Sequence, residues 1–146
     1  MLIAVAIVAY TISILAFARG VISLDSNMLG AVINSIGALV PLGLFVLSGV
    51  KLSEASTGGW KGYSWALVGG IAIGVFTLAM TRIFAVGGNV SFVTPLVYGG
   101  AVSLATVIGI VVYKERLPAL QLSGATVILL GILMIVYSRY QQGVTT

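Results

Sequence analysis

Residues 28–50 read MLGAVINSIGALVPLGLFVLSGV, and no charged side chain interrupts them. A run of roughly 20 apolar residues is the length that an α-helix needs to cross a bilayer. Lipid offers no partner to a free backbone amide or carbonyl, so a run of this kind has to be helical. The sequence therefore predicts a transmembrane helix over residues 28–50.

Apolar runs of similar length recur along the rest of the chain. They predict further spans over residues 2–17, 64–84, 90–112 and 119–137. The first run follows no basic segment and contains no small-residue cleavage motif, so we interpret it as a mature span rather than a signal peptide. The expected fold is an all-α, multi-pass protein of the cell membrane, with residues 1–146 forming one domain of five transmembrane helices.

The composition excludes several classes of function. Apolar residues make up 60% of the chain and charged residues only 7%, too few to cover the surface of a soluble domain. The absence of Cys and His removes thiol catalysis, disulfides and the commonest transition-metal ligands. The sequence also lacks a His-Glu metalloprotease helix, a Ser-Lys pair within the spans and a glycine-rich phosphate loop. We therefore expect no enzyme activity, no metal and no cofactor.

The basic residues lie near the ends of the apolar runs and give a net charge of +4. Such a balance in a membrane protein reflects anchoring to headgroups and not nucleic-acid binding. Five spans place the termini on opposite sides of the membrane. The N-terminal side would then carry Lys51, Lys61, Lys114 and Arg116, and the other side Arg19, Arg82 and Arg139. This near-balance gives either a weakly set orientation or insertion in both orientations.

All three acidic residues, Asp25, Glu54 and Glu115, fall in predicted linkers. A proton/cation antiporter that works through a carboxylate needs an acid inside the membrane. The sequence therefore argues against proton-coupled export of lipophilic cations. The linker that contains Asp25, residues 23–27, also supplies N-cap residues for the helix that follows.

A few polar side chains occur at mid-depth in the predicted spans and need partners there. We interpret Tyr10, Asn34, Thr77 and Tyr98 as candidates to line a substrate cavity, and the alternative is that they only join helices. Arg82, near the end of its span, has two interpretations. Its long side chain reaches the headgroups, or it forms a fixed positive charge at a cavity mouth.

Small residues mark faces on which helices approach closely in lipid. Gly70 and Gly74 form a GxxxG pair, and Gly124 and Gly131 are spaced by a heptad. These four glycines predict helix-packing or dimer contacts.

Two prolines fall inside predicted spans. Pro41 and Pro95 each lack an N–H, so each frees a carbonyl one turn earlier, near Gly37 and Ser91. Broken helices of this kind surround many transporter sites, and they also occur as plain kinks. Both interpretations predict helix kinks at Pro41 and Pro95.

The stretch from Trp65 to Arg139 resembles the EamA-like domain of the drug/metabolite transporter superfamily. Five short segments carry the resemblance. The first two are Ala79-Met80-Thr81-Arg82-Ile83-Phe84 and Ser91-Phe92-Val93-Thr94-Pro95-Leu96-Val97. The third is the charged turn Tyr113-Lys114-Glu115-Arg116-Leu117. The last two belong to the glycine-spaced final helix and are Gln121-Leu122-Ser123-Gly124-Ala125 and Ile128-Leu129-Leu130-Gly131-Ile132-Leu133. Tyr10-Thr11 replaces the Trp-Gly pair that is common in the first helix of the family.

The resemblance implies half of an inverted-repeat transporter, because typical members contain two such five-helix units. The chain would then pair with a second copy of itself, and the even charge balance favours an antiparallel homodimer. The glycine-spaced last span also resembles the dimerising helix of small multidrug resistance proteins, which carry a glutamate in their first helix that this chain lacks.

The expected function is a secondary transporter or facilitator that works by alternating access. Its uncharged cavity would suit uncharged or zwitterionic metabolites, amino acids among them. One alternative is a non-transporting membrane subunit or scaffold whose polar stripes only pack helices, and another is a half-unit that has no activity alone.

Overall fold

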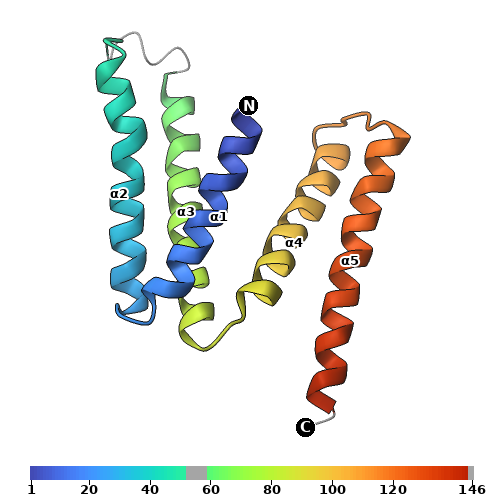
Figure 1. Ribbon diagram of the computed structural model, residues 1–146. Helices are drawn as coiled ribbons and strands as arrows, with labels where there is room; N and C mark the ends of the chain where they lie inside the picture. Colours follow the sequence, from blue (N-terminus) through green and yellow to red (C-terminus); the bar gives the residue numbers. More distant parts are fainter. Residues whose placement is uncertain (52–58, 145–146) are drawn as a thin grey trace. The chain divides into compact units, whose positions relative to one another are not determined.

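The computed structural model describes residues 1–51 and 59–144, and this part of the chain is all-helical (Figure 1). The helices are α1 (Leu2–Gly20), α2 (Ser26–Leu47), α3 (Trp60–Ala85), α4 (Val90–Val111) and α5 (Ala119–Val144). All five are long and apolar enough to cross a membrane, as a multi-pass membrane protein requires. The all-α fold of the described residues, with five helices suited to cross a membrane, is thus confirmed.

The helix ends differ from the predicted span ends in a consistent way. α1 continues past Phe17 to Gly20, α3 begins at Trp60 instead of Ser64, and α5 continues well past Tyr137. Hydropathy marks the residues that suit hydrocarbon, whereas a helix also continues through polar residues outside it. α2 differs in the other direction, because Ser48 caps it and Gly49, with φ of +68°, follows. The predicted linker that contains Glu54, between the spans 28–50 and 64–84, falls mostly outside the described residues.

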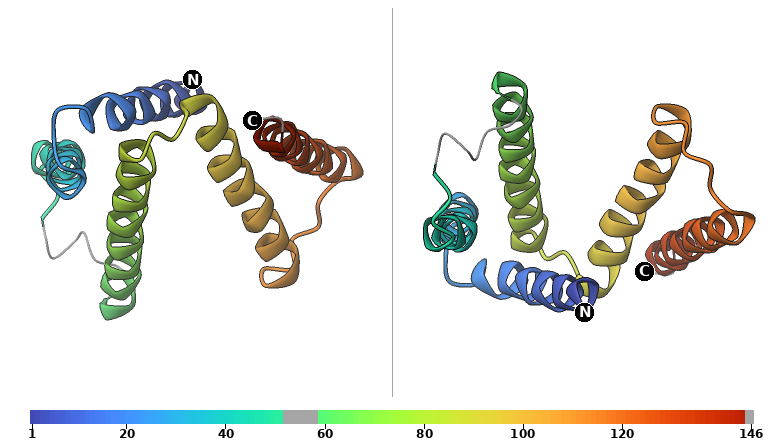
Figure 2. Two further views of the ribbon diagram at one scale, coloured as in Figure 1. Left: turned by 90° about the horizontal axis from the view of Figure 1, so that it is seen from below. Right: turned by 90° about the horizontal axis from the view of Figure 1, so that it is seen from above.

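The helices form two compact units, Met1–Gly87 and a second unit that begins at Gly88. In the first unit α3 packs against both α1 and α2, and Figures 1 and 2 show α1 crossing the C-terminal half of α3. The buried apolar side chains there are Ile14, Phe17, Leu29, Met80 and Phe84. They come from the end of α1, the start of α2 and the end of α3, so the core of this unit lies at one end of its helices.

Short-range contacts fix the α1–α2 connection at this end. The Asp25 carboxylate accepts hydrogen bonds from the backbone N–H groups of Asn27 (2.8 Å) and Met28 (3.2 Å), which satisfies two donors at the start of α2. The capping role predicted for linker 23–27 is confirmed. Gly20 lies against Leu29, and a Cβ at Gly20 would be 2.6 Å from a Leu29 methyl group. A residue without a side chain therefore lets α1 end close to α2.

In the second unit α4 and α5 pack against each other as an antiparallel pair (Figure 1). The charged turn between them closes α4, because the Glu115 N–H donates to the Gly109 carbonyl (3.0 Å) and Lys114 takes a left-handed conformation with φ of +53°. The Glu115 carboxylate lies over Gly109, where a Cβ would be 2.8 Å from Oε2. The Pro118 carbonyl then accepts from Gln121 and Leu122 as α5 begins. The grouping of both units in one EamA-like domain stays a prediction.

The two prolines within spans do not end their helices. α2 continues through Pro41 to Leu47, and α4 continues through Pro95 to Val111. Neither proline can donate to the carbonyl four residues earlier, which belongs to Gly37 in α2 and Ser91 in α4. The kinks predicted at both positions stay predictions.

Adjacent glycines in α4 provide a test of the α4–α5 packing. The Ile132 side chain occupies the space where a Gly99 Cβ would stand, whereas no described atom lies within 4 Å of a Gly100 Cβ. We expect Gly99→Leu to destabilise the purified protein by about 1–3 kcal/mol through overpacking. Gly100→Leu should change its stability little. Thermal unfolding in detergent measures both, and equal stability of the two variants would contradict this packing.

Candidate functional site

The first unit holds a cavity of about 650 Å³ between α1, α2 and α3. This volume is within the roughly 300–1,000 Å³ range that small-molecule sites occupy. The cavity is next to the buried core, and Phe17 contributes to both. It is lined by Tyr10, Ser13 and Phe17 of α1, by Ile33, Asn34, Gly37 and Ala38 of α2, and by Gly70, Ile73, Gly74, Phe76 and Thr77 of α3. All of these side chains are uncharged.

One polar contact joins two helices at the wall of this cavity. The Thr77 hydroxyl of α3 donates a hydrogen bond of 3.1 Å to the Asn34 side-chain carbonyl of α2. Thr77 is only 3% exposed, so its hydroxyl needs a partner within the protein. Asn34 is partly buried. We name this contact the Asn34–Thr77 pair.

The Asn34–Thr77 pair differs from most hydroxyl contacts of the described helices. Ser13, Thr81 and Ser103 each donate to a carbonyl of their own helix, at 3.0, 3.0 and 2.8 Å. Such a back-bond satisfies a hydroxyl at membrane depth without any neighbouring helix. Thr77 instead pairs with a second helix, and it does so at the wall of the cavity described above.

The Asn34 amide has more hydrogen-bonding capacity than Thr77 uses. A carboxamide has two N–H donors and two acceptor lone pairs, and Thr77 engages only one end of the group. Within the described residues the Asn34 N–H donors contact no acceptor. The pair therefore holds the amide at a defined place while its second end stays available to a molecule in the cavity.

Three of the predicted cavity residues, Tyr10, Asn34 and Thr77, thus line one cavity. Tyr98 belongs to α4 in the second unit, and its place at this cavity stays a prediction. Arg82 is exposed and is not part of the cavity wall. Its guanidinium donates from Nη2 to the Asn27 side-chain carbonyl (3.2 Å), where α3 ends and α2 begins.

The predicted packing glycines lie in two different settings. Gly70 and Gly74 line the cavity, and a Cβ at either position would meet no described atom within 4 Å. Gly124 and Gly131 of α5 also have no described neighbour within that distance. Packing of these four glycines against a second copy stays a prediction, and within the described chain Gly70 and Gly74 provide space for the cavity.

Sequence reasoning did not identify the apolar part of the wall, which is Phe17, Ile33, Ala38, Ile73 and Phe76. A usable signal was present, because Tyr10, Ser13 and Phe17 are spaced as one helical face. Similarly, Ala38 lies one turn beyond Asn34, and Ile73 one turn before Thr77. The helical period of the polar residues would have pointed to these neighbours.

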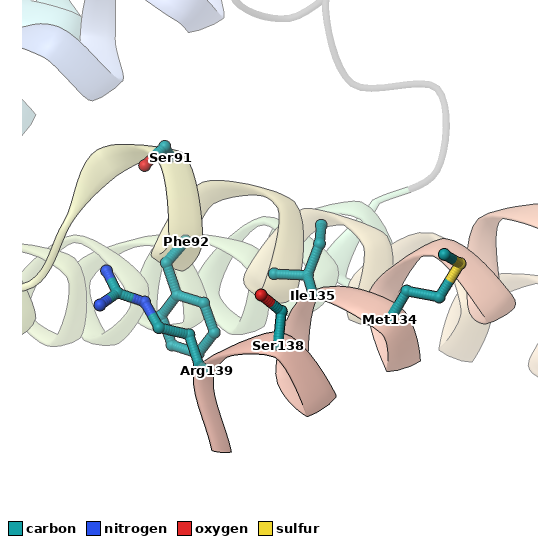
Figure 3. A pocket seen from close by; sticks show the side chains of 6 residues that line it. All are labelled: Ser91, Phe92, Met134, Ile135, Ser138 and Arg139. Atoms are coloured by element: carbon teal, nitrogen blue, oxygen red, sulfur yellow. The ribbon is translucent and has the colours of Figure 1, made fainter. Parts of the chain in front are cut away.

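A second, smaller pocket of about 290 Å³ lies in the second unit, between the start of α4 and the end of α5 (Figure 3). It is lined by Ser91, Phe92, Met134, Ile135, Ser138 and Arg139. The Arg139 guanidinium carbon lies 5.3 Å from the centre of the Phe92 ring, a cation–π distance. The sequence marked Arg139 only as a charge near the end of the last span.

Neither concavity has the composition of a metal centre. The described residues contain no group of three or more His, Cys, Asp or Glu side chains that could hold a metal ion.

Comparisons with known proteins give no further identification. No model of a protein family matches the chain, and no curated protein or solved structure matches it either.

The Asn34–Thr77 pair predicts a measurable coupling between α2 and α3. Thr77→Val removes the hydroxyl at nearly constant shape, and we expect a loss of about 0.6 kcal/mol, the average measured for such bonds in lipid, and at most about 1.7 kcal/mol. Thr77→Val should cost much less when Asn34 is already Leu. Ser13→Ala is the control, since that hydroxyl bonds within α1. Unfolding of the single and double variants measures the coupling, and strictly additive losses would rule out the pair.

Proposed function

We propose that the chain is a small-molecule secondary transporter or facilitator of the drug/metabolite transporter type. It works as a homodimer by alternating access and carries uncharged or zwitterionic metabolites. The observation that carries this proposal is the Asn34–Thr77 pair at the wall of an uncharged cavity of about 650 Å³.

Two observations favour the interpretation that the cavity binds a solute over the interpretation that its residues only pack helices. A membrane protein that needs only a packing seam fills the space between its helices, whereas here Gly70 and Gly74 leave it open. A polar amide at membrane depth is costly, and its retention beside an open cavity is typical of a binding site.

The chemistry of the wall restricts the substrate class. The hydrogen-bonding groups that it offers, on Tyr10, Ser13, Asn34 and Thr77, are neutral, and Phe17 and Phe76 add apolar surface. A lipophilic cation would lose its hydration without gaining a carboxylate partner. A neutral solute, or a zwitterion whose charges compensate each other, loses less hydration free energy on entering the cavity.

The number of helices and the distribution of charge support a dimer of inverted copies. The five membrane-crossing helices equal one half of an inverted-repeat carrier. If all five helices cross the membrane, the seven basic residues divide four to three between its two sides. In addition, α5 leaves Gly124 and Gly131 without described neighbours, so this face can accept a second copy.

A non-transporting subunit or scaffold is the second candidate. The back-bonded hydroxyls favour it, because Thr106 and Thr126 satisfy themselves on Val102 and Leu122 of their own helices and need no substrate. In that case the Asn34–Thr77 pair would join α2 to α3 and nothing more.

Two adjacent glycines of α3 separate these candidates. Gly70 lines the cavity and Gly69 does not, yet a Cβ at either position meets no described atom. We expect Gly70→Leu to fill part of the cavity and lower exchange of amino acids or other neutral metabolites in proteoliposomes at least about tenfold, equivalent to ~1.4 kcal/mol. Asn34→Leu should lower exchange similarly, and Gly69→Leu should not.

The scaffold candidate makes the opposite prediction. If purified protein exchanges no tested metabolite, and Asn34→Leu preserves the cellular phenotype while Gly131→Leu abolishes it, the transporter proposal fails and helix packing explains the polar residues.

The inverted dimer has a separate test. Reporter fusions at the C-terminal residue, Thr146, should be active on both sides of the membrane if the chain inserts in both orientations. The measurement is the ratio of a reporter that works inside to one that works outside. A single orientation would leave only a parallel arrangement of the copies.

A further inference from the structure

The smaller pocket of the second unit brings a cation and two hydroxyls together at the end of a membrane-crossing helix. Arg139 and Ser138 belong to α5, whereas Ser91 and Phe92 belong to the first turn of α4. Figure 3 shows the Arg139 side chain running alongside the Phe92 ring, with the Ser91 and Ser138 hydroxyls on the same two helix ends.

The Arg139 guanidinium lies against an aromatic ring and is not neutralised by a described carboxylate. Among the described residues its contact is the Phe92 ring, at 5.3 Å from the ring centre, and no carboxylate pairs with it. An aromatic ring attracts a cation by its face but leaves the planar N–H donors at the guanidinium edge unused. The guanidinium N–H groups can therefore form bidentate hydrogen bonds with an anion.

Two serine hydroxyls at this pocket are also available as donors. Ser123 and Thr126 of α5 each donate to a carbonyl of their own helix, whereas Ser91 and Ser138 have no hydrogen-bond partner within the described residues. Asn89, the N-cap of α4, makes no side-chain capping bond, so the first N–H groups of α4 also lack a side-chain acceptor. A group with several acceptor oxygens could engage these donors together with Arg139.

The position of the pocket along α5 and its apolar residues indicate which kind of molecule contains such an acceptor group. The last apolar run of the sequence ends near Tyr137 and polar residues follow it, so Arg139 lies where the hydrocarbon gives way to the headgroups. Met134 and Ile135, one turn earlier on α5, extend the pocket toward the hydrocarbon. We propose that this pocket binds the phosphate of a phospholipid headgroup, with Arg139, Ser91 and Ser138 as donors and Met134 and Ile135 beside the acyl chain.

The α1 arginine provides a matched control. Arg19 is also an exposed arginine near the end of an apolar helix, but it lines neither the cavity nor the smaller pocket. If the only effect were the attraction of any interfacial cation to anionic lipid, Arg19 and Arg139 would contribute equally.

The experiment is a titration of the detergent-purified full chain with phosphatidylglycerol, read by native mass spectrometry as the fraction that retains one lipid. We expect Arg139→Gln to weaken retention about tenfold and Arg19→Gln to change it less than about twofold. Ser138→Ala should weaken it to an intermediate degree, and it keeps the test informative if Arg139→Gln folds poorly. Diacylglycerol with the same acyl chains should not be retained.

Three outcomes of these titrations would overturn the assignment. Equal effects of the two arginine variants would mean general charge attraction. Retention of diacylglycerol as strong as that of phosphatidylglycerol would mean an apolar groove. Displacement of the lipid by excess inorganic phosphate, with phosphate itself bound, would mean a site for a free anion. Unchanged transport by Arg139→Gln would not affect the lipid site, so this proposal stands or falls separately from the transporter.

Discussion

Lipid supplies no hydrogen bonds, and this constraint determines most of what the chain does with its polar groups. The backbone meets it by forming helices, and the hydroxyls of Ser13, Ser103 and Thr106 meet it by bonding to carbonyls of their own helices. These residues then impose nothing on their neighbours. Thr77 and Asn34 meet the same requirement through each other, and the price is that α2 and α3 must stay at a fixed distance there.

This constraint also gives the first unit its two regions. Toward one end, Phe17, Leu29, Met80 and Phe84 are buried, and the Asp25 cap holds the start of α2 in place. Beyond that core the small residues of α2 and α3 leave an open cavity, and the Asn34–Thr77 pair is part of its wall. The packed end gives the open region next to it a rigid support, which would suit the proposed alternating-access carrier.

The fold could be predicted from sequence to a large extent, since length and hydropathy alone identify membrane-crossing helices. The capping role of the 23–27 linker followed from residue chemistry as well. The helix ends were harder, because Trp60 to Tyr63 and the residues after Tyr137 are helical although hydropathy does not require it. Of the site, the polar members Tyr10, Asn34 and Thr77 were predictable, because a polar side chain at mid-depth is costly. The apolar wall was not, since Phe76 or Ile73 is equally suited to lipid, to a core or to a cavity. Arg139 was missed because its significance depends on Phe92, which is far away in sequence.

The turn between α4 and α5 has a consequence for how the protein enters the membrane. Its left-handed Lys114 and the Glu115–Gly109 contact reverse the chain within a few residues, so α4 and α5 form a tight hairpin. A hairpin of two apolar helices can partition into lipid as one unit, with its backbone already satisfied. The three charges at its tip, Lys114, Glu115 and Arg116, then have to reach a water boundary together. Because Glu115 offsets one of the two cations, the tip carries a net charge of only +1, and translocation of the tip meets a smaller electrostatic barrier than two uncompensated cations would impose.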